Sequence, residues 1–143
     1  MYEEIKMALG DWFKRPGAYV LVDGQYGSTG KGLVAGLLAE CFKDDVICVI
    51  SNQGPNSGHT SYYGDEKIVL KQLPTFSVIA HKIGGYTPAT YFSAGAVIDG
   101  DILEKEKEKH KITGVIIDPN AAIVLPCDKE ADKTTVDNIA STG

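Results

Sequence analysis

Apolar and polar positions in the first third of the chain predict one strand–helix–strand unit. Residues 18–23 form an apolar, β-branched run that is typical of a buried strand. The glycine-rich residues 24–30 follow, and residues 31–43 carry apolar side chains at helical spacing. Residues 46–50 form a second apolar run of the same kind. A strand, a loop, a helix and a strand within about thirty residues predict a βαβ unit and therefore a parallel sheet.

The rest of the chain predicts short elements around this unit. We expect an N-terminal helix over residues 2–15 and a hairpin that turns at residues 64–65. Asp99 is placed to cap a helix that runs to about His110, and the alternating Glu and Lys of residues 104–109 are typical of a solvated face. Further predicted elements are strands over 91–97, 115–118 and 122–125 and a helix over 128–140, whereas residues 73–75 interrupt the pattern.

Composition indicates one globular domain. The 143 residues are 43% hydrophobic and 23% charged, and the net charge of −5 argues against a nucleic-acid-binding surface. No apolar run approaches the roughly twenty residues that a membrane helix needs, and the acidic N-terminus is unlike a signal peptide. Cys41, Cys48 and Cys127 contain no C-x-x-C pair. We therefore expect reduced, mostly buried thiols and a cytoplasmic protein.

The glycine-rich segment DGQYGSTGKG, residues 23–32, has the chemistry of a phosphate loop. Its glycines let successive backbone N–H groups converge on phosphate oxygens, and Lys31 adds a positive charge at the start of a helix. It is not a standard P-loop, because five residues rather than four separate Gly24 from Gly30 and Gly32 stands where Ser or Thr would ligate Mg²⁺. The alternative is a glycine-rich turn without a ligand.

A second loop, NSGHT at residues 56–60, comes directly after the second predicted strand. In a parallel sheet this position lies at the carboxyl edge, beside the phosphate loop. His59 is suited there to donate a proton or to stabilise a transferring phosphoryl group, and a structural histidine in a turn is the alternative. His81 and His110 have no such context, and we expect His110 to be exposed.

Together the two loops resemble the signatures of the adenylosuccinate synthetase family. The family's G-Q-W-G-D-E-G-K-G loop stands here as GQYGSTGKG, and its Q-G-G-x-N-A-G-H-T loop stands here as QGPNSGHT. Residues 141–143 fit the start of its T-T-G-x-G loop, so the resemblance runs from about residue 17 to residue 143. It implies an α/β fold with a P-loop-like, mostly parallel sheet flanked by helices. Because the family chain is much longer, we expect residues 1–143 to be the N-terminal portion of a nucleotide-binding domain.

The resemblance implies a purine-nucleotide ligase that works in two steps. A nucleoside triphosphate phosphorylates the 6-oxygen of a purine nucleoside monophosphate, and the amine of L-aspartate then displaces that phosphate at C6. Lys31 would act at the triphosphate and the 6-oxygen, His59 would be the general acid, and the Gly58 carbonyl would ligate Mg²⁺. By the same resemblance, the triphosphate site comprises Gly27, Ser28, Thr29, Gly30, Lys31, Gly32, Gly58, His59 and Thr60, and the purine-nucleotide site comprises Ser28, Asn56, Ser57 and Thr142.

One departure from the family signature bears on the substrate. Ser28 occupies the place of the family's catalytic, Mg²⁺-binding aspartate, and Thr29 that of the adjacent glutamate. A serine hydroxyl is a poor base at neutral pH without a partner and a weaker Mg²⁺ ligand than a carboxylate. The shorter, neutral side chain leaves room for the 2-amino group of guanine, and this resembles the phage-type 2-aminoadenylosuccinate synthetases. We hypothesise that Asp23, just before the loop, supplies the missing carboxylate.

Several functions remain open at this point. The resemblance favours a ligase that joins L-aspartate to (d)GMP with ATP or dATP on the way to diaminopurine DNA. The alternatives are an ordinary adenylosuccinate synthase, which uses IMP and GTP, and an inactive nucleotide-binding relative. A switch GTPase is disfavoured by Gly32, and a purely structural domain would leave both loops without ligands. For either ligase we expect a homodimer without nucleic-acid or membrane partners, in the cytoplasm or, for a viral protein, in the host cytoplasm.

Overall fold

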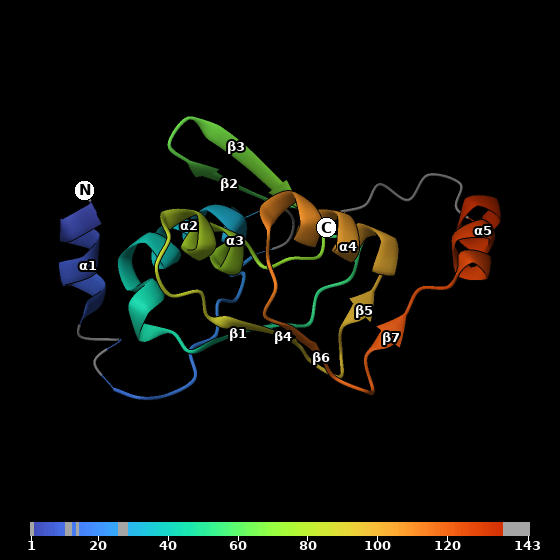
Figure 1. Cartoon of the computed structure of the whole chain (residues 1–143), viewed down its shortest axis with the longest axis horizontal. Coiled ribbons are helices and arrows are strands. Elements are labelled where there is room, and N and C mark those ends of the chain that lie inside the picture. Colours follow the sequence, from blue (N-terminus) through green and yellow to red (C-terminus); the bar gives the residue numbers. More distant parts are fainter. Residues whose placement is uncertain (1, 11–12, 14, 26–28, 136–143) are drawn as a thin grey trace.

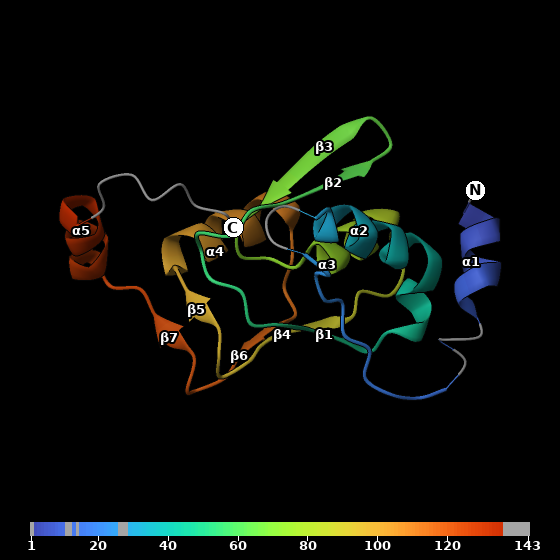
Figure 2. The ribbon, with the colours of Figure 1, turned by 180° about the vertical axis from the view of Figure 1, so that it is seen from behind.

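The computed structural model describes residues 2–10, 13, 15–25 and 29–135. Its centre is a parallel sheet in the order β1-β4-β6, formed by β1 Cys48–Ser51, β4 Ala89–Phe92 and β6 Val115–Ile117. Helices α2, α3 and α4 all lie on the same side of this sheet (Figures 1 and 2). The expected α/β fold with a parallel sheet and flanking helices is confirmed.

Two smaller strand pairs lie outside the central sheet. β2 (His59–Tyr63) and β3 (Glu66–Leu70) form the expected antiparallel hairpin, in which His59 pairs with Leu70. Gly64 supports its turn with a φ of 57°, in the left-handed region that favours glycine. β5 (Val97–Ile98) pairs in parallel with β7 (Ala122–Ile123). The single strand expected over residues 91–97 is thus two strands, β4 and β5, in different sheets.

The expected helices are present with different ends, and one helix was not expected. The helix expected over 2–15 ends at Gly10, and residues 136–140 of the helix expected over 128–140 lie outside the described residues. The bounds of the helices are α1 Tyr2–Gly10, α2 Lys31–Phe42, α3 Thr75–Ile83, α4 Gly100–His110 and α5 Pro126–Thr135, with a short 3₁₀ turn over Lys43–Asp45. The Asp99 carboxylate caps α4 as expected, because it accepts hydrogen bonds from the N–H groups of Asp101 (3.0 Å) and Ile102 (3.3 Å). The sequence pattern does not predict helix α3, because residues 73–75 interrupt it. A proline is equally compatible with a helix start, and α3 begins directly after it.

The hydrophobic core lies between the helices, the hairpin and the covered face of the sheet. Its fully buried members come from all of these elements: Ala39, Ile68, Leu70, Leu73, Val78, Ile79, Ala80, Phe92, Ala96 and Ile98. On the opposite face of the sheet, Ile50 is 66% exposed and Ile116 is 54% exposed. Burial therefore joins α2, α3 and the hairpin into one unit on one side of the sheet, and this unit positions the two glycine-bearing loops.

The strand expected over residues 18–23 is wrong. These residues are irregular, and Val20 and Val22 are 82% and 72% exposed. A strand is stabilised by hydrogen bonds to a neighbour and by packing of its faces. None of the described strands pairs with this segment, so its apolar sequence alone does not make it a strand.

Two further expectations about burial are wrong, and a third holds in part. His110 is buried rather than exposed, and Cys48 and Cys127 are exposed whereas Cys41 is buried. The Glu/Lys run of α4 is not wholly solvated, because the half-buried Glu106 turns back toward the chain before α3. Its carboxylate accepts hydrogen bonds from three consecutive backbone N–H groups, those of Lys71 (2.7 Å), Gln72 (3.1 Å) and Leu73 (2.8 Å). Among the described residues, no helix has the length and apolar character that crossing a membrane requires.

Candidate nucleotide site

Two glycines of α2 allow the second loop to pack directly on this helix. A Cβ added at Gly32 would lie 2.6 Å from the Thr60 carbonyl oxygen and 2.9 Å from the Thr60 nitrogen. A Cβ at Gly36 would lie 2.1 Å from the Ser61 hydroxyl oxygen. Gly32, which departs from the P-loop pattern, is therefore required by a close approach between the backbones of α2 and β2. This contact holds the phosphate loop and the second loop side by side.

The start of α2 has the form of an anion site. Gly30 precedes the helix with a φ of 84° and a ψ of 19°, in the left-handed region that side chains rarely adopt. Its carbonyl oxygen accepts the first intrahelical hydrogen bond, from the Val34 N–H at 3.1 Å. The first N–H groups of a helix have no partner within it and carry a partial positive charge. The loop therefore ends where a phosphate group is well stabilised.

Lys31 is the first residue of α2 and contacts a carboxylate across the loop. Its ammonium donates a hydrogen bond to one oxygen of Asp23, and the Thr29 hydroxyl donates to the other. The side chains of Lys31 and Asp23 are 35% and 26% exposed. The hypothesised carboxylate is thus at the loop, where it is engaged by two residues of the expected triphosphate site.

His59 is the first residue of β2 and lies half-buried beside this charge. Burial and, to a lesser extent, the positive charge of Lys31 lower the pKa of its imidazole below 6.5. Both effects disfavour the protonated ring, so His59 is mainly neutral at neutral pH. The backbone contact between Gly32 and Thr60 brings the chain neighbours of these two residues, Lys31 and His59, to the same junction of α2 and β2.

The residues before His59 form a turn at the rim of a cavity. Ser57 donates two hydrogen bonds to the Gly54 carbonyl, from its N–H at 3.2 Å and from its hydroxyl at 2.7 Å. Asn56 and Gly58 are exposed, and a Cβ at Gly58 would meet no atom within 4 Å. Asn56 lines a cavity of about 440 Å³ together with Asp99 and Lys129.

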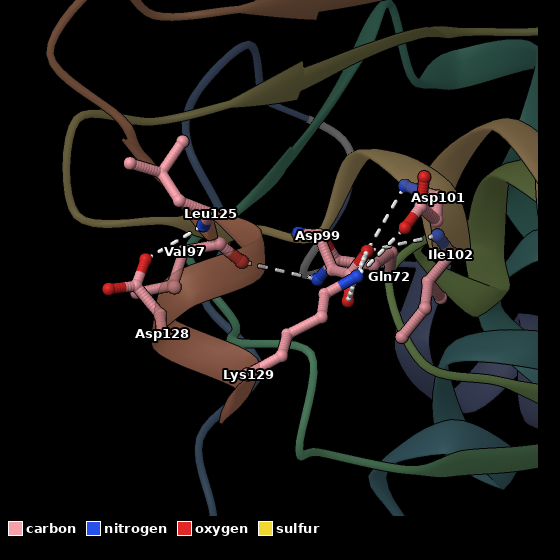
Figure 3. Close-up of polar contacts among 8 residues, drawn as sticks. All are labelled: Gln72, Val97, Asp99, Asp101, Ile102, Leu125, Asp128 and Lys129. Atoms are coloured by element: carbon pink, nitrogen blue, oxygen red, sulfur yellow. Dashed lines mark hydrogen bonds and ion pairs between the residues drawn. The ribbon is translucent and has the colours of Figure 1, made fainter. Parts of the chain in front are cut away.

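The far wall of this cavity is polar and was not expected from the sequence. Lys129 of α5 donates hydrogen bonds to Asp99 (2.9 Å) and Asp101 (2.9 Å), as Figure 3 shows. The buried Gln72 fixes the strand that leads to Asp99, because its side-chain amide bonds Val97 O (3.3 Å) and Asp99 N (2.9 Å). No local motif marks Lys129, since only the fold brings α5 to the start of α4.

Comparisons with known proteins show the family of this chain. The family model described as adenylosuccinate synthetase matches residues 20–143. The chain belongs to the adenylosuccinate synthetase family. It is 33% identical over 124 residues to the N6-succino-2-amino-2'-deoxyadenylate synthase of cyanophage S-2L, covering 83% of this chain and 32% of that protein. It is 32% identical over 132 residues to the adenylosuccinate synthetase of Methanococcus aeolicus, covering 87% of this chain and 37% of that protein.

Solved structures of the family have the same fold as this chain. The cyanophage S-2L succinoaminodeoxyadenylate synthetase, bound to dGMP and to dATP as energy donor, matches with a TM-score of 0.67 and 31% identity, over 80% of this chain and 31% of that one. The adenylosuccinate synthetase of Plasmodium falciparum matches in fold, with a TM-score of 0.64 and 23% identity, over 77% of this chain and 24% of that one. The chain thus spans about a third of the length of the curated relatives it matches.

The structure brings together those expected site residues that it describes. Thr29, Gly30, Lys31 and Gly32 form the end of the phosphate loop and the start of α2, and Asn56, Ser57, Gly58, His59 and Thr60 form the adjoining loop and strand. Gly27, Ser28 and Thr142 lie outside the described residues. Their expected roles stay predictions.

The described donors are compatible with the Mg²⁺ that the family resemblance implies. Mg²⁺ prefers oxygen ligands and is commonly held by one or two protein oxygens together with substrate phosphates. Gly58 is exposed next to His59 and a Cβ added there would meet no atom within 4 Å, so there is space for a ligand at this residue. Its backbone carbonyl is an oxygen donor of the kind that Mg²⁺ prefers. Ser28, the other expected ligand, lies outside the described residues.

Proposed function

We propose that this chain forms the triphosphate and purine sites of a ligase that joins L-aspartate to C6 of dGMP, with ATP or dATP as phosphoryl donor. The observation that carries the ligase chemistry is the packing of Gly32 on Thr60, which brings the start of α2, with Lys31, against the start of β2, with His59. This contact supports a shared site for the two side chains. The sequence Ser28-Thr29, where the family has Asp-Glu, supports the dGMP substrate. The likeness to the cyanophage S-2L enzyme supports the same choice.

The described residues account for the first step in physical terms. Backbone N–H groups at the start of α2 and the Lys31 ammonium would bind the outer phosphates and oppose the charge of the transferring group. Negative charge then develops on the purine 6-oxygen. A neutral His59 has one ring N–H with which to donate a hydrogen bond to that oxygen, and this stabilises the charge without adding a second cation beside Lys31.

Mg²⁺, held by the Gly58 carbonyl and by Ser28, would supply further positive charge at the phosphates. Phosphorylation turns the 6-oxygen into a good leaving group, which the amine of L-aspartate can displace. This second step needs an aspartate site. None of the residues discussed above is assigned to it, so aspartate as the amine donor rests on family membership.

The second candidate is an ordinary adenylosuccinate synthase that uses IMP and GTP. It is favoured by the likeness to the Methanococcus aeolicus enzyme, at nearly the same identity as the phage relative. Guanine and hypoxanthine differ at C2, so the base sites of the two candidates differ beside N1. The candidates also differ in the sugar of the monophosphate and in the donor nucleotide. An inactive, nucleotide-binding relative is the third outcome that an assay can return.

One assay separates these candidates. The complete gene product is incubated with L-aspartate and Mg²⁺, with ATP or GTP, and with either dGMP or IMP, while phosphate release and the mass of the nucleotide product are measured. Aspartate-dependent release with dGMP and formation of the succinylated nucleotide are expected. Release with IMP alone would contradict the dGMP proposal, and release with neither nucleotide would indicate the inactive relative.

The proposed homodimer is tested separately, by the molar mass of the complete gene product in solution. A monomer that retains full turnover would contradict it. The cytoplasmic location stays a prediction from the sequence, and localisation of a tagged copy of the complete gene product tests it.

A further inference from the structure

Asp23 engages the phosphate loop in a way that no family signature given above assigns. The signature begins at Gly24, one residue later, and its acidic positions are occupied here by Ser28 and Thr29. The Asp23 carboxylate reaches across the loop to Thr29 and Lys31, where one of its oxygens accepts from the hydroxyl and the other from the ammonium. Among the described residues of the loop, it is the only carboxylate. The Asp23 carboxylate is therefore paired with the Lys31 ammonium, the positive charge that a bound triphosphate would need.

The triphosphate and Asp23 compete for the same ammonium. A lysine ammonium is a compact point charge, and an outer phosphate binds it best at the distance that a carboxylate also prefers. A triphosphate at the start of α2 would bring several negative charges close to Asp23, in a site where Lys31 and Asp23 are only about one-third and one-quarter exposed. Repulsion between these anions opposes binding as long as the carboxylate keeps its place.

We propose that Asp23 is an internal counter-ion of the phosphate loop, which holds Lys31 in the empty site and releases it when a triphosphate binds. This inference rests on the proposed triphosphate site but goes beyond it, because it assigns Asp23 a positioning role through Lys31. In the empty site the ion pair keeps Lys31 and Thr29 close to the mouth of the loop. In this exchange, a phosphate group of the ligand replaces the Asp23 carboxylate on Lys31. The exchange favours ligands with several phosphates, because a single phosphate replaces one anionic contact of Lys31 with another and adds little binding free energy.

The first test measures ATP affinity in the complete gene product by isothermal titration calorimetry. Asp23→Asn keeps the size of the side chain and removes its charge, and we expect it to bind ATP about three- to tenfold more tightly than the wild type. The matched control is Asp44→Asn, which breaks an exposed pair of the same type, Lys43–Asp44 at 2.6 Å. This control should leave the affinity unchanged. Equal or weaker ATP binding by Asp23→Asn would overturn the inference, because a merely structural carboxylate would weaken the site when removed.

The second test observes the lysine itself. The ¹⁵N resonance of the Lys31 ammonium, identified by its loss in Lys31→Met, should differ between wild type and Asp23→Asn in the empty protein. With ATP bound, the two proteins should give the same resonance, because the lysine then contacts phosphate in both. A difference that persists with ATP bound would show that the carboxylate stays on the lysine and that no exchange occurs.

The outcomes separate this inference from the proposed function. ATP binding without turnover of dGMP or IMP contradicts the ligase and leaves the exchange measurable in the same titrations. Turnover with unchanged ATP affinity in Asp23→Asn contradicts the exchange and leaves the ligase in place. A wild-type protein that binds no ATP contradicts both.

Discussion

Replacement of Gly32 by alanine is the sharpest test of how the two loops are joined. The added Cβ would lie 2.6 Å from the Thr60 carbonyl oxygen, so α2 and β2 must separate by about 0.8 Å to reach the 3.4 Å of ordinary contact. Both sides of this contact are backbone, which cannot rotate away. Alanine is favoured over glycine within a helix by about 1 kcal/mol, whereas overpacking of a tight interior costs about 1–3 kcal/mol.

We therefore expect Gly32→Ala to lower the free energy of unfolding by up to about 2 kcal/mol, measured by urea denaturation. A shift near 1 Å between groups that act together costs about a hundredfold in activity, so ligase turnover should fall much more than stability. The control is Gly100→Ala at the start of α4, where a Cβ meets no atom within 4 Å and stability should be unchanged or higher. A Gly32→Ala protein as stable and as active as the wild type would refute the close packing of the loops.

Two other predictions concern groups described above. Glu106→Ala should lower the free energy of unfolding by about 2–4 kcal/mol in urea denaturation, because three backbone N–H groups lose a charged acceptor. The control Glu104→Ala, on the exposed side of α4, should change the free energy of unfolding by less than about 0.5 kcal/mol. Equal effects of the two substitutions would contradict the role of Glu106. His59 should titrate below pH 6.5 by NMR, and Lys31→Met should raise its pKa, since the positive charge of the lysine contributes to the lowering. Because the folded protein binds this proton more weakly than the unfolded chain, the contribution of His59 to stability is fully present above the unfolded pKa of 6.5 and is lost as the pH falls through the lower pKa of the folded protein. An unchanged His59 pKa in Lys31→Met would place the two side chains apart.

Local chemistry made the loop predictable from the sequence. A left-handed glycine before a helix and a lysine at its first residue depend on neighbours in the chain, and α2 begins at Lys31 as expected. The capped start of α4 at Asp99 is local in the same sense. In both cases the start of the helix can be predicted from the types of a few residues that are neighbours in the chain.

Features that depend on distant partners could not be predicted in this way. Leu33 and Val34 belong to the apolar residues at helical spacing in α2, but they are 49% and 43% exposed. The buried residues of this helix include Gly32, Gly36 and Ala39. A close approach between two backbones requires small residues such as glycine, and the spacing of large hydrophobic residues does not identify these positions. Glu106 lies in a run with charged neighbours on both sides, and only the fold brings the N–H groups of residues 71–73 to its carboxylate.

The central claim is that the two loops form one triphosphate site that includes Lys31 and His59. Calorimetric titration of ATP into wild type, Lys31→Met and the control Lys43→Met tests it most directly, with the His59 ring resonance followed by NMR in the same samples. We predict at least tenfold weaker binding for Lys31→Met, unchanged binding for Lys43→Met and a shift of the His59 resonance on ATP addition to the wild type. Equal affinity in all three proteins, or binding that leaves the His59 resonance in place, would contradict the claim.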